Sequence, residues 1–83
     1  MYELFLCDYK RKPKLVEQVS GKMEEECKKK ANAFFKTEDG RRLCRGYRDI
    51  QFTDDRSCEN NLRTGAFKNS KKMPAWFEIR KQI

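Results

Sequence analysis

Apolar side chains occupy nearly every position at the start of the chain. In residues 2–9, one alternating set contains Leu4 and Leu6, and the other contains Phe5 and Cys7. Successive side chains of a β-strand point to opposite faces, so both faces of this segment are apolar. A strand that is covered on both sides is typical of the centre of a sheet. We therefore expect a central strand here, followed by a basic turn.

A helical periodicity follows that turn. Apolar residues between Leu15 and Phe35 recur at steps of three and four, as one face of a helix requires. Pro13 suits the first turn of a helix, where its missing N–H has no intrahelical partner to lose. Three Glu–Lys pairs spaced four apart lie between residues 24 and 30, and each adds about 0.2–0.5 kcal/mol to helix stability. These features predict one long helix.

The ends of this helix are less sharply marked than its middle. Gly21 is its weak point, because an interior glycine costs roughly 1 kcal/mol relative to alanine. We expect the helix to end near Lys36, with a turn at Asp39 and Gly40. The alternative is that residues 34–37 form a strand that pairs across this turn.

Two further alternating segments predict strands. Residues 44–53 place Ile50 and Phe52 on one face. Residues 75–83 place Phe77, Ile79 and Ile83 inward, with Trp76, Glu78, Arg80 and Gln82 outward. The connection between them is too long for a structureless loop in a compact domain. We expect residues 56–63 to form a short helix that is closed by Gly65.

Together these elements predict a single α+β domain over residues 1–83. The expected order is β-α-β-(short α)-β, with a three-stranded, mainly antiparallel sheet and one long helix packed on one face. A chain of 83 residues is long enough for one domain and too short for two.

Composition points to an anionic partner. The chain has 20 Lys and Arg against 13 Asp and Glu, a formal net charge of +7. Such an excess attracts polyanions and speeds encounters with them. No run of apolar residues is long enough to span a membrane, and the first residues lack the basic start of a secretion signal. We expect a cytoplasmic protein.

Catalytic chemistry is poorly represented. The chain contains no histidine, the commonest acid–base group at neutral pH, and no nucleophile or nucleotide-binding motif. The acidic residues Asp49, Asp54, Asp55 and Glu59 fall around a turn and a helix start, where aspartate is expected for capping alone. The four cysteines are too widely spaced for a zinc site, so we expect free, mostly buried thiols. We expect no enzyme activity, no cofactor and no metal.

The basic residues fall into three clusters at turns and strand ends, where long cationic side chains can reach a phosphate backbone. The clusters are Lys10, Arg11, Lys12 and Lys14; Arg41, Arg42, Arg45 and Arg48; and Arg63, Lys68, Lys71 and Lys72. The alternative interpretation is a solvated surface that serves solubility alone.

The face of the sheet opposite the helix offers a second kind of contact. If Leu4, Leu6, Ile50, Phe52, Phe77 and Ile79 face the helix, alternation places Phe5, Tyr9, Tyr47 and Trp76 on the other side, together with Arg45 and Arg80. Aromatic rings flanked by arginines on an open sheet can stack on single-stranded bases. The alternatives are that residues 54–74 cover this face, or that it binds a protein, including a second copy of this chain.

The sequence therefore predicts a small, non-catalytic module that binds single-stranded RNA or DNA. The expected backbone contacts come from Lys10, Arg11, Lys12, Arg41, Arg42, Arg45, Lys71 and Lys72. The expected stacking face comprises Phe5, Tyr9, Tyr47 and Trp76, with Arg80 beside them. The alternative function is a regulator or inhibitor, of the kind that phages and mobile elements encode, which docks on an acidic protein surface. A homodimer through the open sheet face is a further option.

Overall fold

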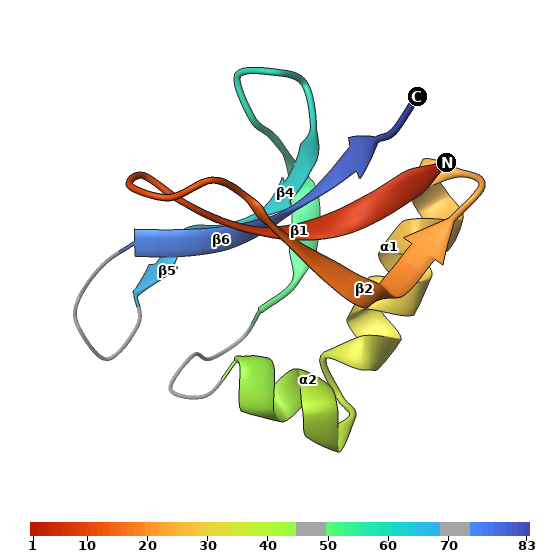
Figure 1. Ribbon diagram of the computed structural model, residues 1–83, viewed down its shortest axis with the longest axis horizontal. Coiled ribbons are helices and arrows are strands. Elements are labelled where there is room, and N and C mark those ends of the chain that lie inside the picture. Colours follow the sequence, from red (N-terminus) through yellow and green to blue (C-terminus); the bar gives the residue numbers. More distant parts are fainter. Residues whose placement is uncertain (45–49, 69–73) are drawn as a thin grey trace.

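A computed structural model of the chain describes residues 1–44, 50–68 and 74–83. In these residues the fold is α+β, with a six-stranded antiparallel sheet and two short helices (Figure 1). The prediction of three strands and one long helix is therefore wrong. The strand order is β2-β1-β6-β4-β3, and β5 pairs with β6 off this path.

The first strand confirms the opening pattern. Strand β1 (Tyr2–Asp8) pairs with β6 (Pro74–Lys81) along its whole length, from Tyr2 opposite Lys81 to Asp8 opposite Ala75. Its other edge pairs with β2 (Lys14–Gly21). Strand β1 thus lies inside the sheet, as its two apolar faces predict.

Strand β2 occupies the segment where the helix was expected to begin. Its register jumps from Val16 opposite Leu4 to Ser20 opposite Glu3, so that residues 17–19 bulge out of the ladder. The bulge brings Val16 and Val19 into the same core, and their spacing of three imitates a helical face. Valine is also more favourable in a strand than in a helix. Pro13 precedes this strand instead of opening a helix.

Helix α1 (Glu24–Phe34) is the remaining part of the predicted helix. Three glutamates fill its first turn, where the helix dipole favours negative charge. Cys27 and Ala31 are its buried residues. Gly21 is the last residue of β2 and lies against the start of α1. A Cβ at this position would approach the Cys27 backbone nitrogen to 2.8 Å. This close approach, and not a helix interior, explains the glycine.

Helix α2 (Glu38–Leu43) replaces the expected turn at Asp39 and Gly40, and residues 34–37, the alternative strand, are the end of α1 and a short turn. The Thr37 hydroxyl caps it by accepting a hydrogen bond from the Gly40 backbone N–H at 3.1 Å. Gly40 packs against the end of α1 so closely that a Cβ would overlap the Phe34 carbonyl oxygen. A short turn thus leads from α1 directly into α2.

The expected helix over residues 56–63 is instead part of a β-hairpin. Strands β3 (Phe52–Arg56) and β4 (Leu62–Thr64) pair around a turn in which Asn60 adopts a positive φ of 64°. The predicted strand over residues 44–53 is also wrong in its extent, because Cys44 ends α2 and β3 begins at Phe52; residues 45–49 lie outside the described part. Strand β5 (Phe67–Lys68) pairs with the start of β6.

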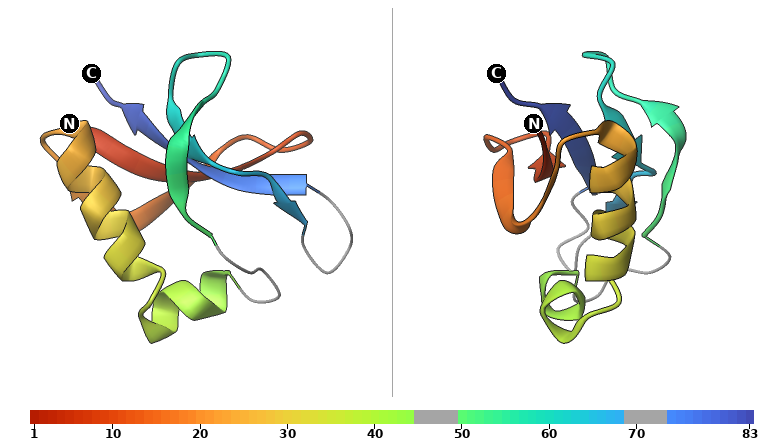
Figure 2. Two further views of the ribbon diagram at one scale, coloured as in Figure 1. Left: turned by 180° about the vertical axis from the view of Figure 1, so that it is seen from behind. Right: turned by 90° about the vertical axis from the view of Figure 1, so that its right-hand side faces the viewer.

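The core lies between the sheet and the helices, which Figure 2 shows on one side of the strands. Of the side chains expected to face the helix, Leu4, Phe52, Phe77 and Ile79 are buried, and Leu6 and Ile50 pack against them. Ile83, expected inward, is exposed. None of the helices in the described residues is long and apolar enough to cross a membrane.

Candidate polyanion-binding surface

The connection between β1 and β2 carries the most accessible group of basic residues. Lys10, Arg11, Lys12 and Lys14 are all exposed, and we call these four residues the cationic hairpin. Figure 1 shows this connection projecting away from α1, at the opposite end of β1 from the N-terminus. Within the described residues, none of the four forms an ion pair with a carboxylate.

Asp8 organises this hairpin. Its Oδ1 atom accepts hydrogen bonds from the backbone N–H of Lys10 at 2.7 Å and of Arg11 at 2.8 Å. These two hydrogen bonds are the main reason that the pKa of Asp8 is lowered, with the nearby positive charges as smaller causes. The carboxylate therefore binds the backbone of the turn and leaves the basic side chains directed to solvent.

Four basic residues elsewhere form ion pairs with acidic side chains in the described part of the chain. Arg42 bonds to Glu38 at 2.9 Å, and Asp39 lies 3.9 Å from the same guanidinium group. Lys30 pairs with Glu26 at 3.1 Å in α1. Two further arginines form ion pairs: Arg56 with Glu24 at 2.7 Å, and Arg80 with Glu78 at 3.1 Å. In the second predicted cluster, Arg41 is exposed, Arg42 is paired, and Arg45 and Arg48 lie outside the described residues.

The aromatic face differs most from expectation. Trp76 is only 8% exposed, although alternation placed it on the side away from the helices. Its Nε1–H donates a hydrogen bond to Glu78 Oε2 at 2.5 Å. The guanidinium carbon of Arg63 lies 5.9 Å from the ring centroid, and the Tyr9 ring lies 5.0 Å away. The prediction of an open Trp76 ring is therefore wrong.

Phe5 is covered in a similar way. The guanidinium carbon of Arg80 lies 5.7 Å from its ring centroid, within the range of a cation–π contact. Arg80 is held over the ring by Glu78, and the exposed carboxylate of Glu59 lies 3.8 Å from it. The arginines of this face thus stack on the protein's own rings. Tyr9, at 73% exposed, is the ring among Phe5, Tyr9 and Trp76 that remains accessible.

Glu78 is the central acceptor of this face, although it was not among the predicted site residues. It is 3% exposed, and its carboxylate accepts hydrogen bonds from Trp76 and from the Asn61 side chain at 3.4 Å, besides the ion pair with Arg80. Burial of a carboxylate is tolerated only where such partners replace water. The spacing Trp76, Glu78, Arg80 on one strand face was the available signal. We name these three residues, with Arg63 and Phe5, the arginine-stacked face.

The other predicted site residues are not placed by the structure. Tyr47, Arg45, Lys71 and Lys72 all lie outside the described residues. At the hairpin end of the sheet, Asp8 and Phe67 both pair with Ala75. The structure therefore brings Tyr9 together with Lys10, Arg11 and Lys12, and places Arg41 and Arg42 on a separate helix.

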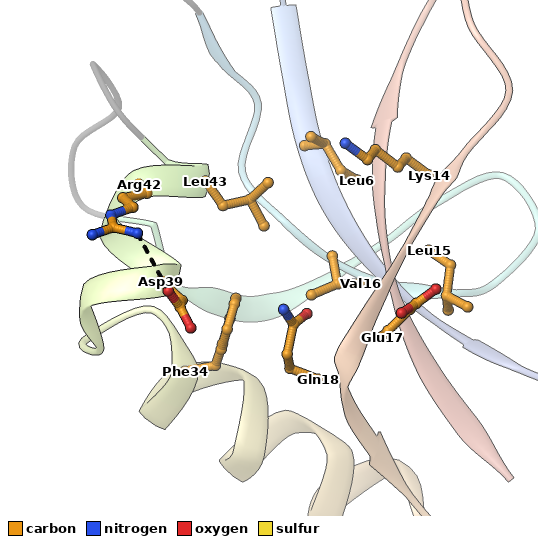
Figure 3. Close-up of a pocket in the computed structure, with 10 residues that line it drawn as sticks. All are labelled: Leu6, Lys14, Leu15, Val16, Glu17, Gln18, Phe34, Asp39, Arg42 and Leu43. Carbon is orange, nitrogen blue, oxygen red and sulfur yellow. Dashed lines mark ion pairs between the residues drawn. The ribbon is translucent and has the colours of Figure 1, made fainter.

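A cavity of about 540 Å³ was not foreseen from the sequence. It lies between β1 and β2 on one side and the end of α1 and α2 on the other (Figure 3). Its apolar lining includes Leu6, Val16, Phe34 and Leu43, and its polar lining includes Lys14, Gln18, Asp39 and Arg42. Lys14 thus belongs both to the cationic hairpin and to this cavity.

The cysteines form no disulfide. Cys7, Cys27 and Cys44 are buried, and burial is the main cause that raises the pKa of each thiol to about 11. Cys58 is exposed in the turn between β3 and β4. Among the described residues no group of cysteine and acidic side chains is arranged to hold a metal ion. These thiols are packing groups in the core, with one surface thiol.

Comparison of the chain with protein-family models, with curated proteins and with solved structures finds no match. The functional argument therefore depends on the geometry and charge of the chain itself.

Proposed function

We propose that this protein binds single-stranded nucleic acid through the cationic hairpin, with Tyr9 as an accessible stacking ring. The observation that carries the proposal is the concentration of unpaired positive charge. The hairpin places four exposed basic side chains within residues 10–14, and none has an acidic partner among the described residues. Elsewhere, Lys30, Arg42, Arg56 and Arg80 have an acidic partner, and the exposed Lys22, Lys29, Lys36 and Lys81 are far from one another along the chain.

The physical basis is counterion release. A protein cation that contacts a phosphate displaces a condensed counterion, and the gain in entropy makes binding favourable at low salt. Side chains already neutralised by carboxylates contribute little, because the phosphate would have to compete with the existing partner. The hairpin has the further advantage that Asp8 orders its backbone before any ligand arrives.

Tyr9 adds a contact that does not depend on charge. It adjoins Lys10 in the chain, and its ring is mostly exposed while resting against Trp76. Stacking of a base on an accessible aromatic ring contributes about 1–3 kcal/mol and tolerates any sequence. Phosphate contacts and one stacking ring favour a ligand whose bases are unpaired. No described group at the hairpin is arranged to read base identity, so the proposed binding is sequence-tolerant.

The test is a salt titration of binding to a short single-stranded oligonucleotide of mixed sequence. For four phosphate contacts to a single strand, the logarithm of the association constant should fall with the logarithm of salt with a slope of about −3. Replacement of Lys10, Arg11, Lys12 and Lys14 by glutamine should remove most of this slope.

The matched control replaces Lys22, Lys29, Lys36 and Lys81 by glutamine. These four lysines are exposed and lie away from the hairpin. Their replacement reduces the net charge by the same amount as the hairpin variant does. The control should bind nearly as well as the original chain. Equal losses in both variants would show that net charge alone is responsible, and no binding at low salt would remove the proposal and favour an acidic protein partner.

A further inference from the structure

The cavity beside the cationic hairpin has the composition of a ligand site. Its volume of about 540 Å³ falls within the roughly 300–1,000 Å³ typical of small-molecule sites. Such sites combine an apolar lining with a few polar groups that orient the ligand. Here Phe34 and Leu43 from the helical side face Leu6 and Val16 from the sheet, and polar side chains surround them (Figure 3).

The position of the side chains along β2 separates the two sides of this strand. Lys14 lies opposite Leu6 in the ladder, so both side chains point to the same side of the sheet. Figure 3 shows Val16 and Gln18 on the side of the strand that faces Phe34, with Leu15 and Glu17 directed away from it. Lys14, Val16 and Gln18 thus line the cavity on the side of this strand that faces the helices, and Leu15 and Glu17 also belong to its lining.

The charged groups that line the cavity are two cations, Lys14 and Arg42, and two carboxylates, Glu17 and Asp39. Of the two cations, Lys14 is the one placed to hold an anionic group. Lys14 has no carboxylate partner among the described residues and continues the row of basic residues from the hairpin. Asp39, the acidic side chain on the helical side, already has Arg42 beside it at 3.9 Å. Gln18 offers both a donor and an acceptor, so it can meet the polar edge of any base.

A peptide that extends the sheet is a poorer occupant of this site. The outer edge of β2 would have to supply a regular row of backbone groups for such pairing. Residues 17–19 of β2 bulge out of register with β1, and bulges protect edge strands from further pairing. A single base requires no such row.

We infer that the cavity receives one unstacked base of the bound strand, while Lys14 holds the adjacent phosphate. This inference rests on the proposed function and deepens it, because it makes the ligand a strand with an extruded base. Phe34 and Leu43 would contact one face of the base, Leu6 and Val16 the other face, and Gln18 its edge.

The experiment compares two strands that carry the same number of phosphates, one with normal bases and one abasic throughout. Because the stacking contribution of a base typically changes affinity by tenfold or more, the original chain should bind the normal strand at least about tenfold more tightly. Equal affinities for the two strands would overturn the inference and the stacking role of Tyr9, while leaving the phosphate contacts of the cationic hairpin intact.

A cavity-filling variant locates the effect. Gln18→Trp introduces a large side chain at an exposed position that faces the cavity, without a change in charge. Ala33→Trp is the matched control, since it adds the same ring at an exposed position of α1 next to Phe34 but does not line the cavity. Gln18→Trp should reduce binding of the normal strand and leave binding of the abasic strand unchanged.

The outcomes separate the two proposals. A Gln18→Trp protein that still prefers the normal strand as strongly as the original chain would overturn the base site. Failure of the original chain to bind either strand at low salt would overturn the proposed function and the base site together. The contrast between strands is measured on the unmodified protein, so it does not depend on the folding of any variant.

Discussion

The cationic hairpin and the arginine-stacked face contain the same kinds of residue and use them differently. In the hairpin, Asp8 bonds to the backbone and leaves the basic side chains in solvent. On the arginine-stacked face, Glu78 is buried and pairs with Arg80, whose guanidinium covers Phe5. One region keeps its cations accessible, and the other uses its cations for its own packing. Charge counts alone therefore do not identify a binding surface.

The largest expected effect is on stability, at the arginine-stacked face. Glu78→Ala removes the shared acceptor of Trp76 and Arg80, and leaves a buried indole N–H without a partner. We expect a loss of about 2–4 kcal/mol in the free energy of unfolding, measured by urea denaturation. Glu59→Ala removes the other carboxylate near Arg80. Because the Glu59 side chain is 67% exposed, this change should lower the free energy of unfolding by less than about 1 kcal/mol. Equal losses would contradict the distinction between buried and exposed partners.

The hairpin should show the opposite behaviour. Replacement of its four basic residues by glutamine is expected to weaken oligonucleotide binding by about a hundredfold at low salt, because four phosphate contacts are lost. The free energy of unfolding should change by less than about 0.5 kcal/mol, since these exposed side chains make no ion pairs among the described residues. A hairpin variant that unfolds more easily would show that the region is structural.

The two neighbouring rings divide the same way. Tyr9→Leu should weaken oligonucleotide binding by about fivefold or more, because it removes an accessible stacking ring. Trp76→Phe should leave binding unchanged but lower the free energy of unfolding by about 1–2 kcal/mol, through loss of the hydrogen bond to Glu78. Titrations and urea denaturation of both variants would test this, and the reverse assignment would refute it.

The buried thiols give a pH-dependent effect. Their pKa is raised to about 11 in the folded protein, above the ordinary thiol value of 9.0. The unfolded state therefore ionises first as pH rises, so stability is complete below about pH 9 and is lost progressively towards pH 11. Denaturation curves at successive pH values should show this decline, and a Cys44→Ala variant should show a shallower one. A flat profile would contradict the burial of these groups.

Thiol labelling is the mildest test of the same burial. In the native protein, Cys58 should react rapidly with a thiol reagent, while the three buried thiols should react only after unfolding. Fast reaction of all four would show that the core opens readily.

Sequence patterns predicted the parts of the fold that depend on alternation. The central strand β1 and the last strand β6 follow from it, as does the inward set Leu4, Phe77 and Ile79. Strand β2 was missed because its bulge gives Val16 and Val19 a helical spacing. The β3–β4 hairpin was missed because its turn depends on Asn60 at positive φ. Asparagine adopts this conformation more readily than most residues but does not require it, so the residue type alone does not predict the turn.

The candidate site was predictable only in part. The basic cluster of residues 10–14 is visible in the sequence because no acidic residue interrupts it. The sequence does not show which arginines contact other side chains of the protein. Arg56 pairs with Glu24, and Arg80 covers Phe5, and each partner lies far away in the chain. The cavity combines residues of four elements, so no local motif marks it.

The most direct test of the central claim is a map of the bound surface by backbone amide NMR. As a mixed-sequence single-stranded oligonucleotide is added at low salt, the amides of residues 8–12 and of Lys14 should shift most. The amide signals around Glu78 and Arg80 should shift little, because these two side chains already form an ion pair with each other. Shifts concentrated on the arginine-stacked face, with the hairpin unaffected, would contradict the account.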